Sequence, residues 1–307
     1  MASMEALFTT LKTLRLQGSI FSRAQLQAPW GVHTLGSERA IFHVVTQGQA
    51  WLRPKGQAPI PLQTGDLAVM MQGQEHIISD AQAGPARHIT RFQAPVGDDG
   101  LPCLSNNADG EQTALLCGTL TFDPGAAPFI ARHLPGVLHA ASGSTAPWLD
   151  TSLRMLAEDV GGQTQGSAGQ AIAGRLAEVL FIQVLRRMAA QDSPPPWLQA
   201  LSDPQIGRAL ALLHQSPQNA WTAQTLAARA GMSRSSFFQR FQALLGETPT
   251  AYLTRWRMTV ACGAMQDPGA GLFEVAQAVG YASEAAFSRA FKREMGQPPS
   301  QWRAALG

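Results

Sequence analysis

The chain has 307 residues, 45% of them hydrophobic and 14% charged, and its formal net charge is +2. This composition excludes an intrinsically disordered protein, and the length favours two domains. The sequence contains neither an apolar run long enough to span a membrane nor a signal-peptide pattern in Met1–Leu16. We therefore expect a cytoplasmic protein with no membrane partner.

The three cysteines, Cys103, Cys117 and Cys262, are odd in number and widely spaced. Such spacing excludes a disulfide framework and a zinc finger. Charge is unevenly distributed, because residues 201–307 hold ten lysines and arginines against six acidic residues. A polyanion would therefore bind at the C-terminal end.

Short apolar segments separated by Gly, Pro and Gln dominate the first 125 or so residues. Their spacing is typical of strands in an antiparallel sandwich or barrel and not of βαβ units. The predicted strands are Ile41–Thr46, Gln49–Arg53, Leu67–Met71, His88–Phe92 and Ala114–Phe122.

Two helices are expected next, at Trp148–Val160 and Gln170–Ala190. The second has one apolar face, formed by Ile172, Leu176, Val179, Leu180 and Val184. No helix can cross the Asp-Ser-Pro-Pro-Pro sequence of Asp192–Pro196. We therefore predict an α+β protein with a sensor and dimerisation domain at 1–195 (barrel about 1–125, helical pair about 148–190) and an all-α domain at 196–307.

The helical domain nearly repeats itself. Leu226–Ser233, followed by Arg234–Leu244, corresponds to Val275–Ser283, followed by Glu284–Met295. In each copy a glycine (Gly231, Gly280) can end a helix, a serine (Ser233, Ser283) can cap the next one, and a phenylalanine pair (Phe237/Phe241, Phe287/Phe291) can bury its rear face. The pattern predicts two helix-turn-helix units, at about 222–245 and 272–295.

The solvent face of each second helix would enter a major groove. Arg, Gln, Ser and Lys are suited to bases and phosphates there; an ordinary solvated helix face is the alternative. The side chains concerned are Arg234, Ser235, Ser236, Gln239 and Arg240 in the first unit and Glu284, Ala285, Ser288, Arg289 and Lys292 in the second. A continuous helix at Ala251–Met265 would hold both units at a fixed separation.

These motifs closely resemble the DNA-binding domain of AraC/XylS-family regulators, above all Val275–Lys292 with Gly296, Pro298 and Pro299. The resemblance covers about 100 residues and implies a transcription regulator, commonly an activator, that binds promoter DNA and contacts RNA polymerase. It implies base-facing positions at Ser235, Phe238, Gln239, Ala285, Ser288 and Arg289. Members commonly have Arg where this chain has Gln239, with Arg240 one step further, which puts the first half-site preference in doubt.

The N-terminal part resembles the cupin-like sensor domain of one AraC subgroup, through Ala28–Gly31, Phe42–Val45, Gly48–Leu52, Gly65-Asp66, Gly73, His76 and Cys117-Gly118. Some relatives in this subgroup respond to reactive chlorine or electrophiles through a cysteine pair. Cys117 occupies one of those places, but the region near Ser22 has no cysteine.

Several residues of the barrel are candidates for sensing. Metal ligands could be His43, His76 and His88, with His33 as a further imidazole, although the His-X-His and Glu pattern of metal cupins is reduced to His43. Trp30, His43, Trp51, His76 and His88 could instead line a site for an organic effector, and Met70 could join them. Cys103, in the loop Leu101–Gly110, and Cys117 could respond to oxidants, although a buried core thiol is the alternative for Cys117.

Two functions follow from these features. The first is a homodimeric, sequence-specific DNA-binding regulator controlled by a small-molecule or redox signal at the barrel, with the helical pair 148–190 as the relay. The other is a metal-dependent cupin enzyme with an accessory helical domain. No catalytic triad or phosphate-binding glycine loop is evident, and no cofactor beyond an effector or a metal ion in the barrel is implied. We therefore favour the regulator.

Overall fold

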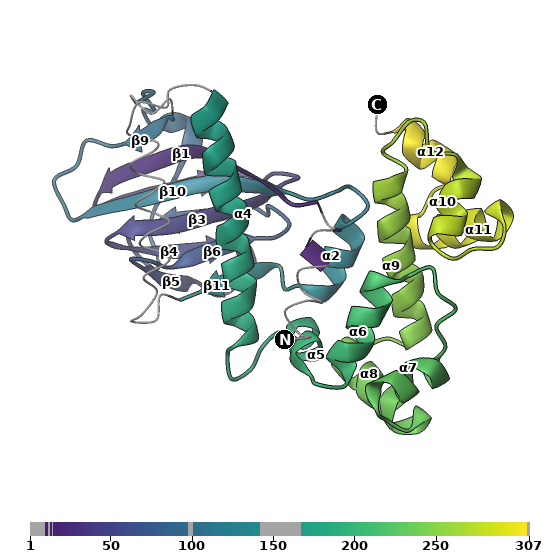
Figure 1. Ribbon diagram of the computed structural model, residues 1–307. Coiled ribbons are helices and arrows are strands. Elements are labelled where there is room, and N and C mark those ends of the chain that lie inside the picture. The colour runs from purple at the N-terminus through teal and green to yellow at the C-terminus, as the bar shows by residue number, and fades with distance from the viewer. Residues whose placement is uncertain (1–9, 12, 14, 98–100, 142–166, 306–307) are drawn as a thin grey trace. The chain divides into compact units, whose positions relative to one another are not determined.

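The computed structural model describes residues 10–11, 13, 15–97, 101–141 and 167–305. The chain packs into two compact units, a β-rich unit (17–121 and 135–188) and a helical unit (1–16, 122–134 and 189–307). This confirms the α+β prediction, with strands first and the helix-turn-helix region last (Figure 1). The predicted helix Trp148–Val160 lies outside the described residues.

The larger sheet has six strands in the order β11-β6-β3-β10-β1-β9. Their bounds are β1 (Gln17–Gln27), β3 (Ala40–Gln47), β6 (Leu67–Met70), β9 (Cys103–Ser105), β10 (Gln112–Thr121) and β11 (Val137–Ala140). β10 pairs antiparallel with β1 on one side and β3 on the other, and Cys117 lies opposite both Ser22 and His43. Because residues directly opposite each other share a face, this register brings the three side chains together.

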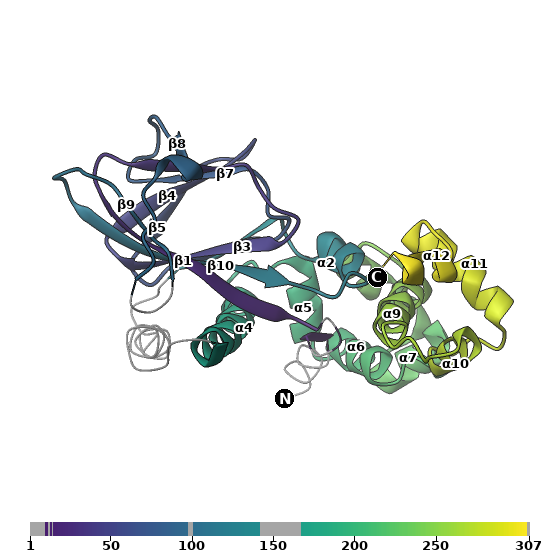
Figure 2. The same ribbon diagram turned by 90° about the horizontal axis from the view of Figure 1, so that it is seen from above.

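The second sheet has five strands in the order β5-β4-β7-β2-β8. They are β2 (Gly31–Thr34), β4 (Gln49–Pro54), β5 (Ile60–Gln63), β7 (His76–Ser79) and β8 (Arg87–His88). Figure 2 shows the two sheets facing each other. Apolar side chains from both fill the space between them, including Leu26, Val45, Leu52, Met70 and Ile78. The expected cupin barrel thus takes the form of two packed sheets.

One long helix, α4 (Ser167–Ala189), lies across the outer face of the six-stranded sheet (Figures 1 and 2). It approaches β1 closely at two glycines, since a Cβ on Gly18 would lie 2.4 Å from the carbonyl oxygen of Gly174. Of the predicted apolar face, Leu180 and Val184 are buried, Leu176 is half-buried and Val179 is 41% exposed. The helix also buries the side chains of Ala177, Phe181, Leu185 and Met188.

Two other local expectations differ from the structure. The strand predicted at His88–Phe92 is limited to β8, and Ile89–Arg91 forms a 3-10 turn (η1) capped by the His88 ring, which accepts from the Thr90 N–H. Such a side-chain bond to the backbone competes with strand pairing. Cys103 lies in β9, paired parallel with β1, and not in a loop.

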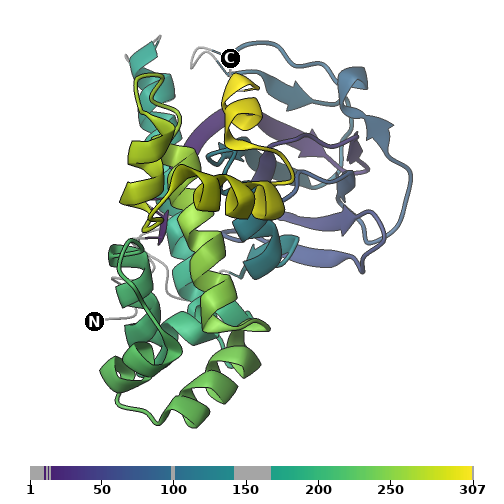
Figure 3. The ribbon, with the colours of Figure 1, turned by 90° about the vertical axis from the view of Figure 1, so that its right-hand side faces the viewer.

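The helical unit contains both helix-turn-helix pairs. Its described helices are α2 (Ala127–His133), α5 (Pro196–Ser202), α6 (Ile206–Gln215), α7 (Ala223–Ala230), α8 (Arg234–Leu245), α9 (Pro249–Ala264), α10 (Leu272–Ala278), α11 (Glu284–Met295) and α12 (Pro299–Ala304). Figure 3 shows α9 running from the green helices α6–α8 to the yellow helices α10–α12. No described helix is both long and apolar enough to cross a membrane.

The short helix α2 lies between β10 and β11 in sequence but packs with the helical unit. Phe129 is 1% exposed, and its ring centroid lies 5.9 Å from that of Trp197, 5.8 Å from that of Tyr252 and 5.3 Å from that of Trp256. The sequence predicts a single domain boundary near residue 195. In the structure, residues 122–134 precede that boundary in sequence but pack with the helical unit that follows it.

Candidate DNA-binding surface and sensor site

Both helix-turn-helix turns are built from a left-handed glycine and a capping serine. α7 ends at Gly231 with φ 69°, and the N–H of Ser236 donates to the Ser233 hydroxyl at 3.2 Å to begin α8. In the second unit Gly280 has φ 84°, and the N–H of Ala286 donates to the Ser283 hydroxyl at 3.3 Å. Glycine adopts this conformation without steric cost, and the serines satisfy N–H groups that the helix leaves unpaired. The structure confirms both turns.

The rear face of each second helix is fixed by its phenylalanine pair. Phe237 and Phe241 have ring centroids 5.6 Å apart, and so do Phe287 and Phe291. All four rings are fully buried. Burying one face of each helix in this way leaves the opposite face to solvent.

The side chains predicted to contact DNA lie on that opposite face. Ten are exposed and one, Ser288, is half-buried: Arg234, Ser235, Ser236, Phe238, Gln239, Arg240, Glu284, Ala285, Ser288, Arg289 and Lys292. Phe238 is a large apolar side chain left 38% exposed, which suits contact with a thymine methyl group. Arg240 is already engaged, since its guanidinium pairs with Asp203 at 2.5 Å. This contact anchors α8 to the turn between α5 and α6.

The helix α9 holds the two units together through Arg257. Its guanidinium donates to the carbonyl oxygens of Pro217 at 2.7 Å and Asn219 at 2.9 Å, and it lies 5.6 Å from the ring centroid of Tyr281 in the second turn. Gly280 packs so closely that a Cβ there would lie 2.5 Å from the Gln218 oxygen. The spacing of the two recognition helices is therefore set by direct contacts as well as by a shared helix.

A buried carboxylate, Glu247, lies directly after α8. It contacts His133 of α2 at 3.1 Å and Arg255 of α9 at 2.7 Å, while Arg255 also binds Glu294 of α11 at 2.9 Å. Burial alone would raise the pKa of the Glu247 carboxyl. Hydrogen bonds from His133 and Arg255 and their charges outweigh burial, so this pKa lies below its ordinary value. One charge network thus joins α2, α9 and both recognition-helix regions.

In the β-rich unit, His43 and His76 come together in the interior with Cys117. The His43 Nε2 lies 2.9 Å from the His76 Nε2, the His43 Nδ1 lies 3.1 Å from the Cys117 Sγ, and the His76 Nδ1 lies 2.8 Å from the Gln74 carbonyl oxygen. Burial lowers the pKa of both histidines, and the His76 ring lowers that of His43 further. Both rings are therefore neutral at pH 7.

Neutral rings give these hydrogen bonds a single direction. The His76 Nδ1 donates to a carbonyl, so its Nε2 must accept from the Nε2–H of His43. The Nδ1 of His43 then accepts from the Cys117 thiol. Since the two nitrogens of His43 point to different partners on opposite sides of the ring, the cluster is a chain and not a convergent ligand set.

The remaining candidates have other partners. His33 and His88 contact each other edge to face at 6.1 Å between centroids, and the His33 Nε2 lies 2.9 Å from a Glu75 oxygen. Trp51 is half-buried in β4, and Trp30 is buried at the start of β2. Across the described residues, no group of three or more His, Cys, Asp or Glu side chains has the arrangement of a metal site.

The geometry does not bring Cys103 and Cys117 together. Cys103 lies opposite Arg23 on β1, while Cys117 lies opposite the neighbouring residue Ser22 on the other side of the same strand. Because neighbouring residues of a strand point to opposite faces, the two thiols lie two strands apart on different faces of the sheet. A disulfide requires Cα atoms within about 7 Å of each other, so this pair cannot close without rearrangement.

A cupin family profile matches residues 5–190, and a helix-turn-helix domain profile matches residues 226–305. The chain is 31% identical to the HTH-type transcriptional regulator AlkR of Acinetobacter baylyi, over 98% of this chain and 99% of that protein. It is 29% identical to the RCS-specific HTH-type transcriptional activator RclR of Escherichia coli, over 98% of this chain and 97% of that protein.

Among solved structures, the chain is similar to the DNA-binding domain of AdpA, a global transcriptional factor, in complex with a target DNA. The identity is 33%, over 34% of this chain and 93% of that one, with a TM-score of 0.32.

Alanine at the two turn glycines should separate backbone strain from crowding. Each substitution costs about 1 kcal/mol for placing a side chain at positive φ. Gly231→Ala meets no atom within 4 Å, whereas Gly280→Ala presses its Cβ against the Gln218 oxygen, which adds roughly 1–3 kcal/mol. Urea unfolding followed by helical circular dichroism measures both; equal losses would show that the turn adapts without cost.

Replacing the buried carboxylate, Glu247→Gln, should destabilise the helical unit by roughly 3 kcal/mol at pH 7. A lowered carboxyl pKa adds stability above the ordinary glutamate value of 4.5 that is lost as the pH falls through the lower, folded-state value. The difference in the free energy of unfolding between wild type and Glu247→Gln should therefore become smaller in acid, as measured by urea unfolding between pH 7 and pH 3. The exposed Glu284→Gln is the matched control, and a gap independent of pH contradicts the assignment.

The three thiols should differ sharply in reactivity. Burial raises the pKa of Cys117 to about 12 and raises that of Cys262 even further, and only thiolates alkylate readily. Iodoacetamide at pH 8 should therefore label the half-buried Cys103 first, as read by peptide mass spectrometry, while all three react in urea. Labelling of Cys117 as fast as Cys103 in the folded protein is the contrary result.

Proposed function

The chain belongs to the AraC/XylS family of helix-turn-helix transcriptional regulators with an N-terminal cupin domain, and we propose that a small molecule bound by the cupin unit controls how it binds promoter DNA. Its relatives are transcriptional regulators and not enzymes, which removes the metal-dependent cupin enzyme as an alternative. DNA binding by its AraC-type domain is the settled part of this function. The signal, the reading residues and the protein partners form the proposal.

The observation that supports the DNA-reading proposal is the pair of recognition helices, each with one buried aromatic face and one exposed polar face, held on the same helix α9. On this basis they enter successive major grooves about 34 Å apart. Gln239 and Arg289 are suited to base edges, because their side chains can form paired hydrogen bonds with adenine and guanine. Lys292 is suited to phosphate, and Arg240, held by Asp203, positions α8.

A small molecule is favoured over an oxidant as the signal. The high pKa of Cys117 keeps its thiol protonated, and the protonated form is the unreactive one. Its partner in a disulfide would have to be Cys103, on the other face of the sheet. Oxidation by that route would require the sheet to come apart.

We place the coupling between sensing and DNA binding at α2, in addition to the helices around 148–190 proposed from the sequence. α2 connects β10, which carries Cys117, to β11, and it packs on α9 through Phe129 and His133. A change in β10 or β11 would reach α2 through the chain itself. Because Glu247 joins α2 to the network at α11, moving α2 would bias the recognition helices.

A homodimer and a contact with RNA polymerase complete the proposal. The apolar face of α4 packs on the six-stranded sheet of the same chain. A dimer through α4 would therefore have to form through the opposite face, where Val179 is exposed. Contact with polymerase follows from the family resemblance alone.

Two substitutions in α11 test the assigned roles. Arg289→Ala should cost roughly 1–3 kcal/mol on the specific site and relax the preference at one base pair, whereas Lys292→Ala should weaken specific and random duplexes alike. Footprinting and salt-dependent binding to DNA from upstream of its own gene measure both. Equal losses on specific and random DNA for Arg289→Ala would refute base reading at that position.

A further inference from the structure

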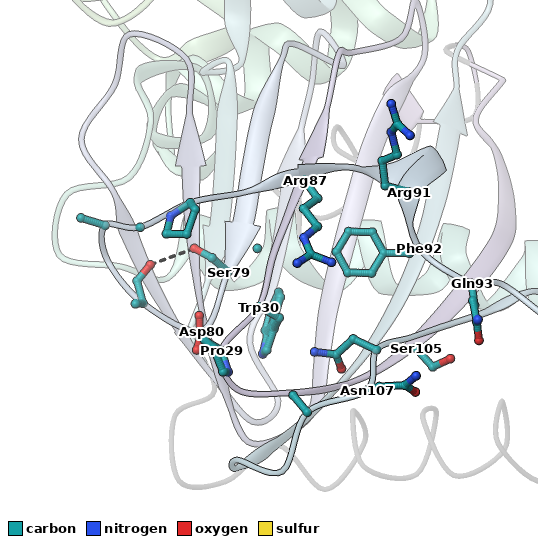
Figure 4. Close-up of a pocket in the computed structure, with 17 residues that line it drawn as sticks. Pro29, Trp30, Ser79, Asp80, Arg87, Arg91, Phe92, Gln93, Ser105 and Asn107 are labelled. Carbon is teal, nitrogen blue, oxygen red and sulfur yellow. Dashed lines mark hydrogen bonds between the residues drawn. The ribbon is translucent and has the colours of Figure 1, made fainter.

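An opening in the β-rich unit lies outside the histidine cluster, where β2 begins and where β7, β8 and β9 connect to loops. It is a cavity of about 610 Å³ whose wall includes Trp30, Arg87, Arg91 and Phe92. Figure 4 shows the Arg87 guanidinium beside the Phe92 ring with Trp30 close by, while Arg91 points away from this group. Sites for small organic ligands usually measure roughly 300–1,000 Å³, so this opening has the size of a ligand site.

The interior of the barrel does not have that size. The space beside His43 and Cys117 is about 40 Å³ and is lined largely by apolar side chains such as Ile41, Ile78 and Leu115. This volume is far below the roughly 300–1,000 Å³ of sites for small organic ligands. An organic effector therefore has no room at the histidines unless the core repacks.

The wall of the outer cavity contains one buried donor without a partner in the part of the chain that the structure describes. Trp30 is only 5% exposed, yet across the described residues its Nε1–H has no hydrogen-bond acceptor. A buried N–H without a partner is unfavourable, but the Trp30 nitrogen is itself buried, so an acceptor in the cavity does not reach it. Two other polar groups in the wall are already used, since the Ser79 hydroxyl donates to the Ala81 carbonyl and the Asn106 amide bonds the backbone of Gln27.

The charge and shape of the cavity wall restrict the class of ligand further. The wall carries two arginines against one acid, Asp80, so it favours an anion. A guanidinium pairs with a carboxylate through two parallel hydrogen bonds, and the half-buried Phe92 ring offers a face for a planar group. Resting on the proposed control by a small molecule, we infer that this cavity is the effector site and takes a planar aromatic anion, with its carboxylate at Arg87 and its ring against Phe92.

Calorimetric titration of the full-length protein with naphthalene-2-carboxylate tests the inference. We expect saturable binding, and at least tenfold weaker binding of the neutral naphthalene-2-carboxamide. Arg87→Gln should weaken the carboxylate tenfold or more and abolish the preference for it over the amide. Trp30→Phe keeps a ring and removes an N–H that is itself buried, so it should bind the carboxylate like wild type.

Arg39→Gln is the matched control, because Arg39 is also an exposed arginine of the β-rich unit but lies outside the cavity wall. It should bind like wild type. Arg87 is exposed too, so Arg87→Gln should stay folded, and circular dichroism checks this for every variant. Absence of saturable binding, equal affinity for the amide, or carboxylate binding unaffected by Arg87→Gln each overturns the assignment.

The same samples are then titrated with upstream duplex DNA, with and without the carboxylate. Duplex binding that shifts with the carboxylate in wild type but not in Arg87→Gln supports the effector site. Duplex binding without carboxylate binding overturns this site and leaves the regulator intact, whereas loss of duplex binding in wild type defeats the proposed function itself.

Discussion

The carboxylate of Glu247 is the contact on which the helical unit depends. Placing a charge where it is 6% exposed is unfavourable unless partners offset the lost hydration, and the partners come from elements far apart in sequence. His133 is 114 residues away in α2, and Arg255 lies two turns along α9 and reaches on to Glu294. The end of one recognition helix is thereby joined to the other recognition helix and to α2.

The contacts around α9 make the two DNA-reading helices a single body. Arg257 binds the loop before α7 and the ring of Tyr281 from the same guanidinium, and Gly280 leaves no gap beside Gln218. A signal that reaches this unit therefore cannot easily rotate one recognition helix without also moving the other. The proposed signal would act on how the pair as a whole meets DNA, as a bias between two arrangements and not as a local adjustment.

Local signals in the sequence were enough to find the two helix-turn-helix units. The Gly231–Ser233 turn and the Phe237–Phe241 spacing lie within about ten residues, and each depends on its neighbours alone. The role of α2 could not be predicted, because Phe129 and His133 acquire their partners only through contacts across more than sixty residues. Strand β1 was missed although its buried residues alternate (Ile20, Ser22, Ala24, Leu26), since Ser22 and Ala24 carry almost no hydrophobic signal.

For the histidines of the β-rich unit, the sequence pattern predicted their positions correctly but did not determine their role. His43 on β3, His76 on β7 and Cys117 on β10 were expected in the interior, and they lie there. Their hydrogen bonds run in one direction, and each ring nitrogen already has a partner. Since β3 and β10 belong to one sheet and β7 to the other, the chain of bonds links the two sheets through the core. Neutral polar groups whose hydrogen bonds are all satisfied specify how the two sheets align. The histidines therefore have a structural role, even though the metal-binding pattern is reduced.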